Sequence, residues 1–395
     1  MKIGVDARVL MDKQYSGVSE YAANLLSAIL RQDSSNEYRI FYNNRQPQED
    51  KLNSWKKDNS EIKGLHYPNK FFNYFLQKIL GWPKIDLFLG GTNVLFSPHF
   101  NFLRVSDKAK LVVTVHDLSF LRYPEFFSRR KNFWHGALGI KKLLARADRI
   151  VAVSNNTKHD LVEVLGLPEE KIKVIYSGNN FRHIAEQNQV QVPDSNLSDS
   201  FLNKHQLKPR FILFLGNVEP RKNIIGLIGS YELLRQRRPD LANTQLVIAG
   251  KRGWKSRGIF VAGRSSLYQS DIKFLGYVSK QEKEILYRSA GIFVYPSFYE
   301  GFGFPPLEAI SFGLPTVSSN ISSLPEVLGK AAILIDPFNV AEISDAIEIA
   351  LTDEAIRARL INLGKAQALT FFWEKTAREY LELFKELHEE GNDKK

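Results

Sequence analysis

Short apolar runs alternate along this chain with longer segments whose apolar residues recur at helical spacing. Such alternation is typical of βαβ units, in which helices join parallel strands and cover both faces of a sheet. In the first half, helices are predicted over Ser19–Arg31 and Asn155–Leu165. Strands are predicted there at Lys2–Val5, Arg39–Tyr42, Val94–Ser97, Leu111–His116, Arg149–Val153 and Lys173–Tyr176.

A second series of the same kind follows a polar segment, His183 to Gln206, that is rich in Gln, Asn, Ser and Asp. The chain ends in an amphipathic helix pattern over Trp373–Leu387. Strands of the second series are predicted at Phe211–Leu215, Gln245–Ala249, Ile272–Phe274, Ile292–Tyr295, Thr316–Ser318 and Ala332–Ile335.

We therefore predict an α/β fold with two doubly wound, Rossmann-like domains. Ligands of such sheets bind beyond the carboxyl ends of the strands, so the cleft between the two sheets is the expected active site. The predicted boundaries are 1–182 for the first domain, 183–208 for the linker, 209–371 for the second domain and 372–395 for the C-terminal helix.

Composition narrows the classes of protein that fit. The 395 residues include no cysteine, which excludes disulfides and thiolate metal sites. No apolar run approaches the roughly 18 residues of a membrane-spanning helix. Met1–Asp6 is interpreted as a first strand rather than a signal peptide. We therefore expect a cytoplasmic protein.

The net charge of +11 is concentrated in the first half. Residues 1–180 hold 27 Lys and Arg against 18 Asp and Glu, whereas the remainder holds 27 against 25. No usual nucleic-acid motif accompanies this charge. An anionic membrane face or a phosphate-bearing acceptor is the favoured partner, with a merely solvated surface as the alternative. A second aromatic and basic stretch runs from Tyr67 to Trp82, and the densest cluster comprises Arg122, Arg129, Arg130, Lys131, Lys141, Lys142, Arg146 and Arg149, with Phe126, Phe127, Phe133 and Trp134 among them.

Two carboxylates, Glu300 and Glu308, lie eight residues apart on either side of a glycine-containing loop. The apolar run before them reads as a buried strand. Pro305 and Pro306 suit a first helical turn, where a missing N–H costs nothing. The pattern predicts exposed backbone amides at Gly301–Gly303 and a helix with Glu308 in its first turn, which suits an anionic sugar nucleotide. A glutamate in a first turn also has a purely structural interpretation.

A second candidate site is the loop Gly216–Asn223, which directly follows the strand predicted at Phe211–Leu215. Arg221 and Lys222 in this loop could stabilise the charge that develops on a diphosphate leaving group, without a metal. Two adjacent cations can equally be solvated surface residues, so the pair alone leaves both interpretations open.

Three weaker signals complete the candidate site. Gly17 lies between the first predicted strand and helix, where a glycine lets backbone approach a phosphate. His116 ends a predicted strand and is followed by Asp117. Tyr277 and Val278 follow the strand predicted at residues 272–274. Each also fits a structural role, as a turn glycine or a satisfied core residue.

The segment Tyr299–Glu308, continued through Val327, resembles the E-x7-E signature of the retaining glycosyltransferases of family 4, which have the two-domain GT-B fold. The loop 216–223 resembles the diphosphate-binding loop of that family and ends in the same Arg-Lys-Asn. Many members place an arginine directly after the first glycine, where this chain has Asn217, so that contact is missing here. The resemblance also implies a C-terminal helix that crosses back onto the first domain.

The resemblance implies a role for each candidate residue. Glu300 contacts the donor sugar and Glu308 the nucleotide ribose. Arg221 and Lys222 hold the leaving diphosphate, and His116 lines the sugar site. Further donor contacts are implied at Gly17, Gly216, Gly301, Phe302, Gly303, Tyr277 and Val278.

The implied function is a hexosyl transfer from a nucleotide diphosphate sugar to an acceptor hydroxyl. The Pro-Arg-Lys-Asn loop resembles mannosyltransferases that use GDP-mannose, which favours a lipid-linked acceptor in surface polysaccharide assembly at the inner face of the membrane. Neither a metal nor another cofactor is expected, because the sequence has no Asp-x-Asp pair and no glycine-rich dinucleotide turn. A sugar-nucleotide epimerase of the same fold and a non-catalytic scaffold remain alternatives; the presence of Glu300 and Lys222 argues against the scaffold.

Overall fold

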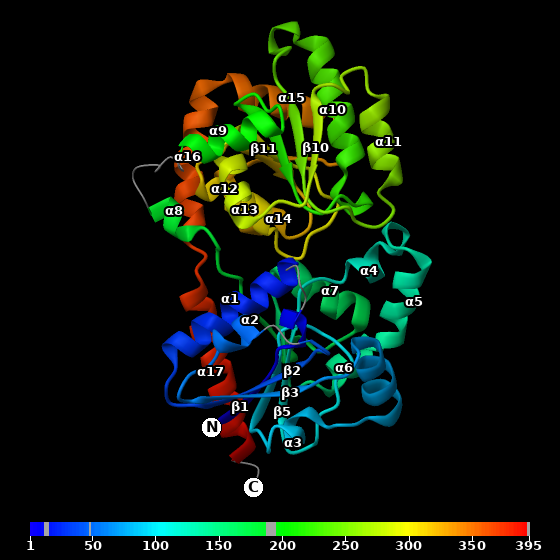
Figure 1. The fold of residues 1–395 in the computed structure, drawn as a ribbon, viewed down its shortest axis with the longest axis vertical. Coiled ribbons are helices and arrows are strands. Elements are labelled where there is room, and N and C mark those ends of the chain that lie inside the picture. Colours follow the sequence, from blue (N-terminus) through cyan, green and yellow to red (C-terminus); the bar gives the residue numbers. More distant parts are fainter. Residues whose placement is uncertain (12–15, 47–48, 187–194, 393–395) are drawn as a thin grey trace. The chain divides into compact units, whose positions relative to one another are not determined.

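The structure is a computed structural model that describes residues 1–11, 16–46, 49–186 and 195–392. The chain forms two compact units (Figure 1). Residues 187–194, in the middle of the predicted linker, lie outside the described residues. Unit 1 comprises Met1–Arg122, Arg130–Gly178 and Phe372–Lys395, and unit 2 comprises Tyr123–Arg129 and Asn179–Phe371.

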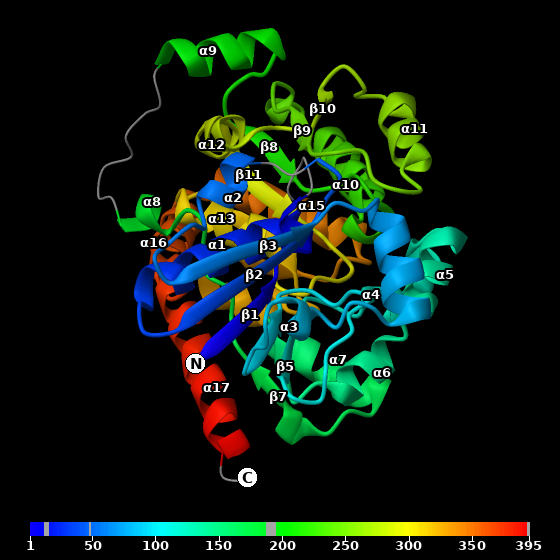
Figure 2. The ribbon, with the colours of Figure 1, turned by 60° about the horizontal axis from the view of Figure 1, so that its bottom comes forward.

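Unit 1 is built on a seven-stranded sheet with the order β3-β2-β1-β4-β5-β6-β7, in which every pairing is parallel (Figure 2). Strand numbers rise outward in both directions from the β1–β4 pair, so the sheet is doubly wound. The strands are β1 (Lys2–Asp6), β2 (Glu37–Asn43), β3 (Ser60–Leu65), β4 (Val94–Ser97), β5 (Lys110–Val115), β6 (Arg149–Ala152) and β7 (Ile172–Val174).

The edge strand β3 is absent from the sequence-based prediction. It pairs only with β2, and most of its residues are half-buried. A strand that packs on few neighbours does not need a continuous apolar run, so hydrophobicity did not reveal it. The other six strands of this sheet were predicted within a few residues of their observed bounds.

Helices surround the sheet of unit 1. In α1, Ser16 caps the first turn by accepting a hydrogen bond from the Ser19 N–H, and the buried face carries the apolar spacing that predicted this helix. The helices are η1 (Arg8–Met11), α1 (Gly17–Gln32), α2 (Glu49–Asn53), η2 (Phe71–Leu80), α3 (Ile85–Phe88), α4 (Ser119–Arg122), α5 (Arg129–Leu138), α6 (Ile140–Arg146), α7 (Asn155–Leu165), η4 (Glu169–Lys171) and α17 (Trp373–Asn392).

The C-terminal helix α17 belongs to unit 1 and packs against α1. The Tyr21 and Tyr380 hydroxyls lie 2.6 Å apart, and the Tyr380 hydroxyl lies 2.7 Å from the Thr114 hydroxyl of β5. This buried chain of hydroxyls joins both helices to the sheet, and each member has a hydrogen-bond partner. Tyr21, four residues after Gly17, is therefore a core residue.

Unit 2 is built on a six-stranded, all-parallel sheet with the order β10-β9-β8-β11-β12-β13. The order reverses between β8 and β11, so this sheet is doubly wound as well. Together the two sheets and the position of α17 confirm the predicted fold class. The strands are β8 (Phe211–Leu215), β9 (Leu246–Ala249), β10 (Ile272–Gly276), β11 (Ala290–Tyr295), β12 (Thr316–Ser319) and β13 (Ile333–Ile335).

One apolar core occupies unit 2, with the fully buried side chains of β8, β9 and β11 at its centre. The residues on either side of 187–194 form α8 and α9 in this unit. The helices are η3 (Pro124–Phe126), α8 (Arg182–Glu186), α9 (Ser195–Lys204), η5 (Pro220–Lys222), α10 (Ile224–Arg237), η6 (Pro239–Leu241), α11 (Arg257–Ser265), α12 (Lys280–Ser289), α13 (Phe304–Ser311), α14 (Leu324–Leu328), η7 (Gly329–Ala331), α15 (Val340–Thr352) and α16 (Glu354–Ala368).

Several members of the basic cluster between Arg122 and Arg149 have partners within the protein. Arg122 pairs with Asp160 at 2.8 Å, and Arg149 pairs with Glu390 at 2.5 Å. Phe127 is buried within unit 2 rather than exposed among the cations. Ion pairs and core packing therefore engage several members of the cluster, and its role at an anionic partner stays a prediction.

Candidate active site

The two candidate loops of unit 2 meet because their strands are neighbours. The loop with Arg221 and Lys222 follows β8, and the loop with Glu300 follows β11. These strands pair in parallel at the point where the strand order of the sheet reverses. Carboxyl ends of strands at such a reversal form the usual ligand-binding edge of an open α/β sheet.

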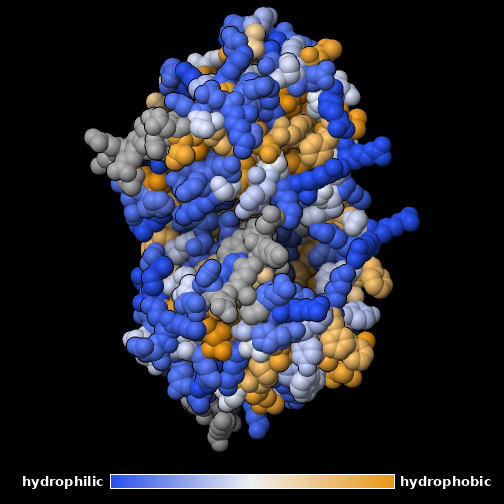
Figure 3. All heavy atoms as spheres, in the orientation of Figure 1, coloured by the Kyte–Doolittle hydropathy of each residue, from blue (hydrophilic) through white to orange (hydrophobic). Residues whose placement is uncertain are grey.

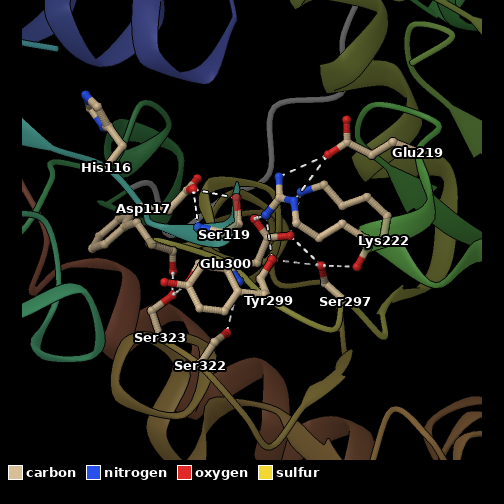
Figure 4. Close-up of polar contacts among 12 residues, drawn as sticks. His116, Asp117, Ser119, Glu219, Lys222, Ser297, Tyr299, Glu300, Ser322 and Ser323 are labelled. Carbon is tan, nitrogen blue, oxygen red and sulfur yellow. Dashed lines mark hydrogen bonds and ion pairs between the residues drawn. The ribbon is translucent and has the colours of Figure 1, made fainter. Parts of the chain in front are cut away.

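Lys222 and Glu300 form a buried ion pair at this edge (Figure 4). The Lys222 ammonium donates to Glu300 Oε1 at 2.5 Å and to the Tyr295 hydroxyl at 2.6 Å. The Ser297 hydroxyl also donates to Glu300 Oε1 at 2.5 Å. Lys222 is 6% exposed and Glu300 is 6% exposed, so this pair is no solvated surface contact.

Arg221 connects Glu300 to a second buried carboxylate. Its Nη1 donates to the Tyr299 carbonyl at 2.5 Å and to Glu300 Oε2 at 3.2 Å. Its Nη2 donates to Glu219 Oε1 at 3.1 Å. Arg221 therefore holds the loop after β11 in place, which is a structural task beyond the diphosphate contact that the resemblance implies.

The two cations determine the charge state of Glu300. Burial by itself raises the pKa of a carboxyl group, but Arg221, Lys222 and the hydrogen bond from Ser297 outweigh it and lower the pKa of Glu300 to about 2. Glu300 is therefore ionised at neutral pH. With Glu219 also present, two cations face two carboxylates in this cluster.

Two serines and a glycine fix the loop that carries Glu300. The Ser323 hydroxyl donates to the carbonyl oxygens of Glu300 and Phe302, each at 3.0 Å, and the Glu300 N–H donates to the Ser322 hydroxyl at 3.0 Å. Gly303 has φ of +103° and precedes the first residue of α13. A Cβ there would lie 2.7 Å from the Leu324 side chain. Both the positive φ and this lack of space therefore favour glycine.

Glu308 lies on α13 and is 2% exposed. Its Oε2 accepts from the Tyr287 hydroxyl at 3.0 Å and lies 3.6 Å from the Lys283 ammonium. Its Oε1 accepts from the Asn180 side chain at 3.2 Å. Two segments of unit 2, helix α12 and the segment with Asn180, therefore position this carboxylate.

Two details of the predicted helix start are wrong. Because α13 begins at Phe304, Glu308 lies in its second turn rather than its first. Gly301–Gly303 are buried rather than exposed, and the Phe302 ring packs edge-on against Phe371. The prolines do occupy the first turn, as predicted.

Backbone approaches closely where β8, β9 and β10 end. A Cβ on Gly250 would lie 1.9 Å from the Gly216 carbonyl oxygen, and the Gly250 N–H donates to the Gly276 carbonyl at 2.7 Å. The two residues that follow β10 differ in exposure. Tyr277 is 55% exposed, whereas Val278 is buried. Of this pair, only Tyr277 offers a side chain to a ligand.

The remaining candidates lie in unit 1. His116 follows β5, and its Nε2 lies 2.8 Å from the Pro98 carbonyl oxygen. Burial lowers the pKa of His116, although the bond to Pro98 opposes this, so the ring is neutral at pH 7 and Nε2–H donates to the carbonyl. Asp117 caps α4 by accepting from the Ser119 N–H at 2.9 Å (Figure 4). Gly17 is exposed at the start of α1.

Sequence reasoning missed the residues that support the two glutamates. Glu219 and Ser297 lay within three residues of the candidate cations and of Glu300, so a search for polar neighbours in the same loops would have found them. Asn180 and Tyr287 are 128 and 21 residues from Glu308 in the sequence, and only the tertiary fold brings them to it.

Two doubly wound, parallel sheets with a C-terminal helix on the first unit define the GT-B class of glycosyltransferase folds. Residues 15–181 match the family model described as Glycosyltransferase Family 4, and residues 198–367 match Glycosyl transferases group 1. The chain belongs to glycosyltransferase family 4 and is a glycosyltransferase.

Its relatives include enzymes of O-antigen synthesis by name. The chain is 34% identical over 291 residues to O-antigen chain mannosyltransferase B of Escherichia coli, a match that covers 72% of each chain. It is 34% identical over 284 residues to the serotype-specific mannosyltransferase WbdA of Escherichia coli, covering 70% of this chain and 34% of WbdA, about a third of that protein's length. Sucrose-phosphate synthase from Thermosynechococcus elongatus has a similar fold, with a TM-score of 0.74, 98% coverage of both chains and 17% identity.

These matches confirm the family, the fold class and the glycosyltransferase activity predicted from the sequence. The roles of the individual site residues stay predictions.

Proposed function

We propose that this protein is a retaining hexosyltransferase that moves mannose from GDP-mannose to an acceptor hydroxyl during surface polysaccharide assembly. The observation that carries the proposal is the buried cluster of Arg221, Lys222 and Glu300 at the strand-order reversal of unit 2. It offers fixed positive charge where a leaving diphosphate needs it and a carboxylate that can accept sugar hydroxyl protons.

Charge balance supports a division of labour within this cluster. Without donor, the two cations are matched by Glu219 and Glu300. A bound diphosphate brings negative charge, so one cation must turn toward it. Lys222 is suited to do so because its single ammonium can exchange Glu300 for phosphate oxygens. Arg221 keeps its bonds to both loops, and Glu300 then turns its freed oxygen to the donor sugar.

Glu308 is suited to bind the ribose. Each carboxylate oxygen can accept two hydrogen bonds. The Tyr287 hydroxyl and the Asn180 amide each use one such position, on different oxygens. The ribose hydroxyls can therefore donate to the remaining positions while the carboxylate stays held by the protein.

The proposed reaction needs no protein nucleophile. The glycosyl bond loosens toward an oxocarbenium ion as Lys222 takes up the charge of the diphosphate. The acceptor hydroxyl attacks the anomeric carbon from the face that the diphosphate leaves, and its proton departs with the phosphate. Configuration is thus retained. The family resemblance assigns His116 to the sugar, and its Nδ1 is the ring nitrogen not used in the hydrogen bond to Pro98.

Two relatives support the choice of sugar and pathway, because both are named mannosyltransferases and one is named for the O-antigen chain. A lipid-linked saccharide at the inner face of the membrane is the corresponding acceptor. The donor is bound without a metal in this proposal, because Lys222 and Arg221 already supply cationic charge at the cluster.

A panel of nucleotide sugars tests the proposal, scored by thermal shift and by release of nucleotide in excess EDTA. GDP-mannose should raise the melting temperature most and turn over without added metal. NMR of the glycoside formed should show the anomeric configuration of the donor. Free nucleotide with a changed sugar and no glycoside would instead identify an epimerase, and activity restored only by Mn²⁺ or Mg²⁺ would overturn the metal-free site.

A further inference from the structure

The helix η2 in unit 1 leaves an unusually apolar face uncovered. Large exposed side chains gather on it and on the turn that follows, and Figure 3 shows such side chains over this part of unit 1. Monomeric proteins seldom leave so many large apolar side chains together in water without a partner. The exposed fractions are 44% for Phe71, 40% for Tyr74, 42% for Phe75, 58% for Ile79, 58% for Leu80 and 54% for Trp82.

The opposite face of η2 is firmly anchored. Phe72 and Leu76 belong to an apolar cluster of unit 1, and the Gln77 side chain donates to the Pro83 carbonyl at 2.8 Å. Asn73 accepts from Arg8 at 2.7 Å, which ties the helix to the carboxyl end of β1. The exposed face therefore belongs to a fixed, amphipathic helix rather than to a frayed segment.

Positive charge surrounds this face. Between Glu61 and Asp86 the sequence has four lysines and no acidic residue. The Lys78 ammonium lies 4.8 Å from the centre of the Tyr74 ring, so positive charge lies directly over an aromatic ring of this face. The Arg104 guanidinium donates to the Lys78 carbonyl at 3.2 Å at the end of the helix.

The apolar surface continues onto α5. The Phe102 ring touches Tyr74 edge-on on one side, with ring centres 6.3 Å apart, and Trp134 edge-on on the other at 5.1 Å. Phe133, next to Trp134, is 74% exposed. The exposed Arg129 and Arg130 open this helix. Part of the basic cluster predicted from the sequence thus borders the η2 face.

We infer that the η2 face, with Phe133 and Trp134 at its margin, is a docking surface for an anionic lipid bilayer. The inference goes beyond the transfer reaction and needs no assumption about donor or acceptor. Within the described residues no helix is long and apolar enough to cross a membrane, so this surface would lie in the interface. Aromatic rings and lysine stems suit the boundary between headgroups and acyl chains, and the cations meet lipid phosphates.

Charge favours a bilayer over the other possible occupants. A second copy would bring the same lysines against these lysines, because a symmetric contact repeats one surface. Residues 62–85 carry positive charge only, and their exposed aromatic rings and lysine stems suit the interface of a bilayer with anionic headgroups. An anionic membrane complements both properties of the surface at once.

Co-sedimentation with vesicles of phosphatidylglycerol and phosphatidylethanolamine tests the apolar part. The variant Phe71→Ser/Phe75→Ser/Ile79→Ser should partition at least about tenfold more weakly than wild type. The control Val261→Ser/Leu267→Ser removes exposed apolar side chains from unit 2 and should bind like wild type. An unchanged circular dichroism spectrum and melting temperature confirm that the triple variant is folded. Equal vesicle binding by all three proteins overturns the inference.

A second pair of variants tests the charge. Lys70→Glu/Lys84→Glu reverses two exposed lysines beside η2, and Lys141→Glu/Lys142→Glu makes the same charge change on α6. The first should lose vesicle binding about tenfold and the second only slightly, with both weakening as salt rises. Equal effects would assign binding to overall charge and overturn the local surface.

Fluorescence identifies what covers the surface. Phosphatidylglycerol vesicles should shift tryptophan emission to the blue, and Trp82→Phe/Trp134→Phe should remove most of that shift. Phosphatidylcholine vesicles should give a much smaller shift. The inference is overturned if wild type shows no shift with anionic vesicles, or if light scattering shows a dimer in solution that Phe71→Ser/Phe75→Ser/Ile79→Ser converts to a monomer.

Discussion

At the scale of single residues, Lys222 and Arg221 are neighbours with different tasks. Lys222→Ala removes the cation assigned to the diphosphate and leaves Glu300 paired with Arg221. We expect kcat to fall by about 10²–10³, the usual cost of a lost preorganised charge contact. The control Lys330→Ala changes an exposed lysine of the same unit and should leave kcat unchanged. Turnover of Lys222→Ala within a few-fold of wild type would contradict the assignment.

Arg221→Ala should lower stability as well as turnover. It leaves Glu219, which is 1% exposed, without its cation and releases the Tyr299 carbonyl. Removing one partner of a buried ion pair typically costs about 3–5 kcal/mol. We therefore expect a lower melting temperature for Arg221→Ala than for Lys222→Ala, measured by calorimetry. Equal melting temperatures of the two variants would show that Arg221 does not stabilise the loop after β11.

Substitution of Glu300 and of Glu308 should have different effects on GDP affinity. Glu300→Gln should leave GDP affinity nearly intact and reduce transfer sharply, because Glu300 is assigned to the sugar. Glu308→Gln should weaken GDP binding itself by about tenfold, since it loses a charged acceptor for the ribose. Titration calorimetry with GDP distinguishes them, and equal losses of affinity would refute the division of roles.

The lowered pKa of Glu300 predicts an acid-sensitive unit 2. Its pKa is about 2 in the folded chain, below the ordinary value of 4.5, so an unfolded chain binds the proton more readily. The stabilisation is present above pH 4.5 and is lost as the pH falls toward 2. Thermal unfolding between pH 6 and pH 3 should therefore depend less on pH in Glu300→Gln than in wild type. Glu232→Gln, which removes a carboxylate on α10, should keep the wild-type dependence.

At the scale of elements, sequence patterns predicted the starts of α1, α7 and α17 within two residues and were weaker for an edge strand and for the loop before α13. Strands with fully buried runs, such as β8 and β11, were predicted near their observed bounds, whereas the half-buried edge strand β3 was missed. The prolines correctly indicated the first turn of α13. They gave no sign that the loop before this helix is buried. Burial of residues 301–303 depends on Ser323, which lies about twenty residues further along the chain.

Gly303 should be intolerant of a side chain because of its backbone. Gly303→Ala places a Cβ at φ of +103° and 2.7 Å from Leu324. We expect a loss of about 1–2 kcal/mol from the backbone conformation alone, with reduced transfer because Glu300 shifts. Gly258→Ala is the matched control, since a Cβ in α11 meets nothing within 4 Å and should be neutral or stabilising. Chemical denaturation of both variants measures the difference.

At the scale of the whole molecule, the alternation of strands and helices was sufficient to predict two doubly wound sheets, whereas the chain's return to the first one was implied by the family resemblance. The pairing of loops was predictable only in part. Adjacency of the Arg221 and Glu300 loops follows from strand order, which the sequence does not encode locally. The ion pairs made by the basic cluster were not predictable from the sequence, because they join residues as distant as Arg149 and Glu390.

We predict that transfer to a lipid-linked acceptor depends on both the catalytic cluster and the η2 face. Presented in anionic vesicles, such an acceptor is concentrated at the surface that the η2 face binds, so surface attachment raises its effective concentration. Phe71→Ser/Phe75→Ser/Ile79→Ser should therefore lower kcat/KM for the vesicle-bound acceptor by about tenfold. The same variant should match wild type with a water-soluble saccharide acceptor, whereas Lys222→Ala should fail with both. Loss of activity with the soluble acceptor as well would mean that η2 supports the active site itself, through the Arg8–Asn73 contact, rather than a membrane.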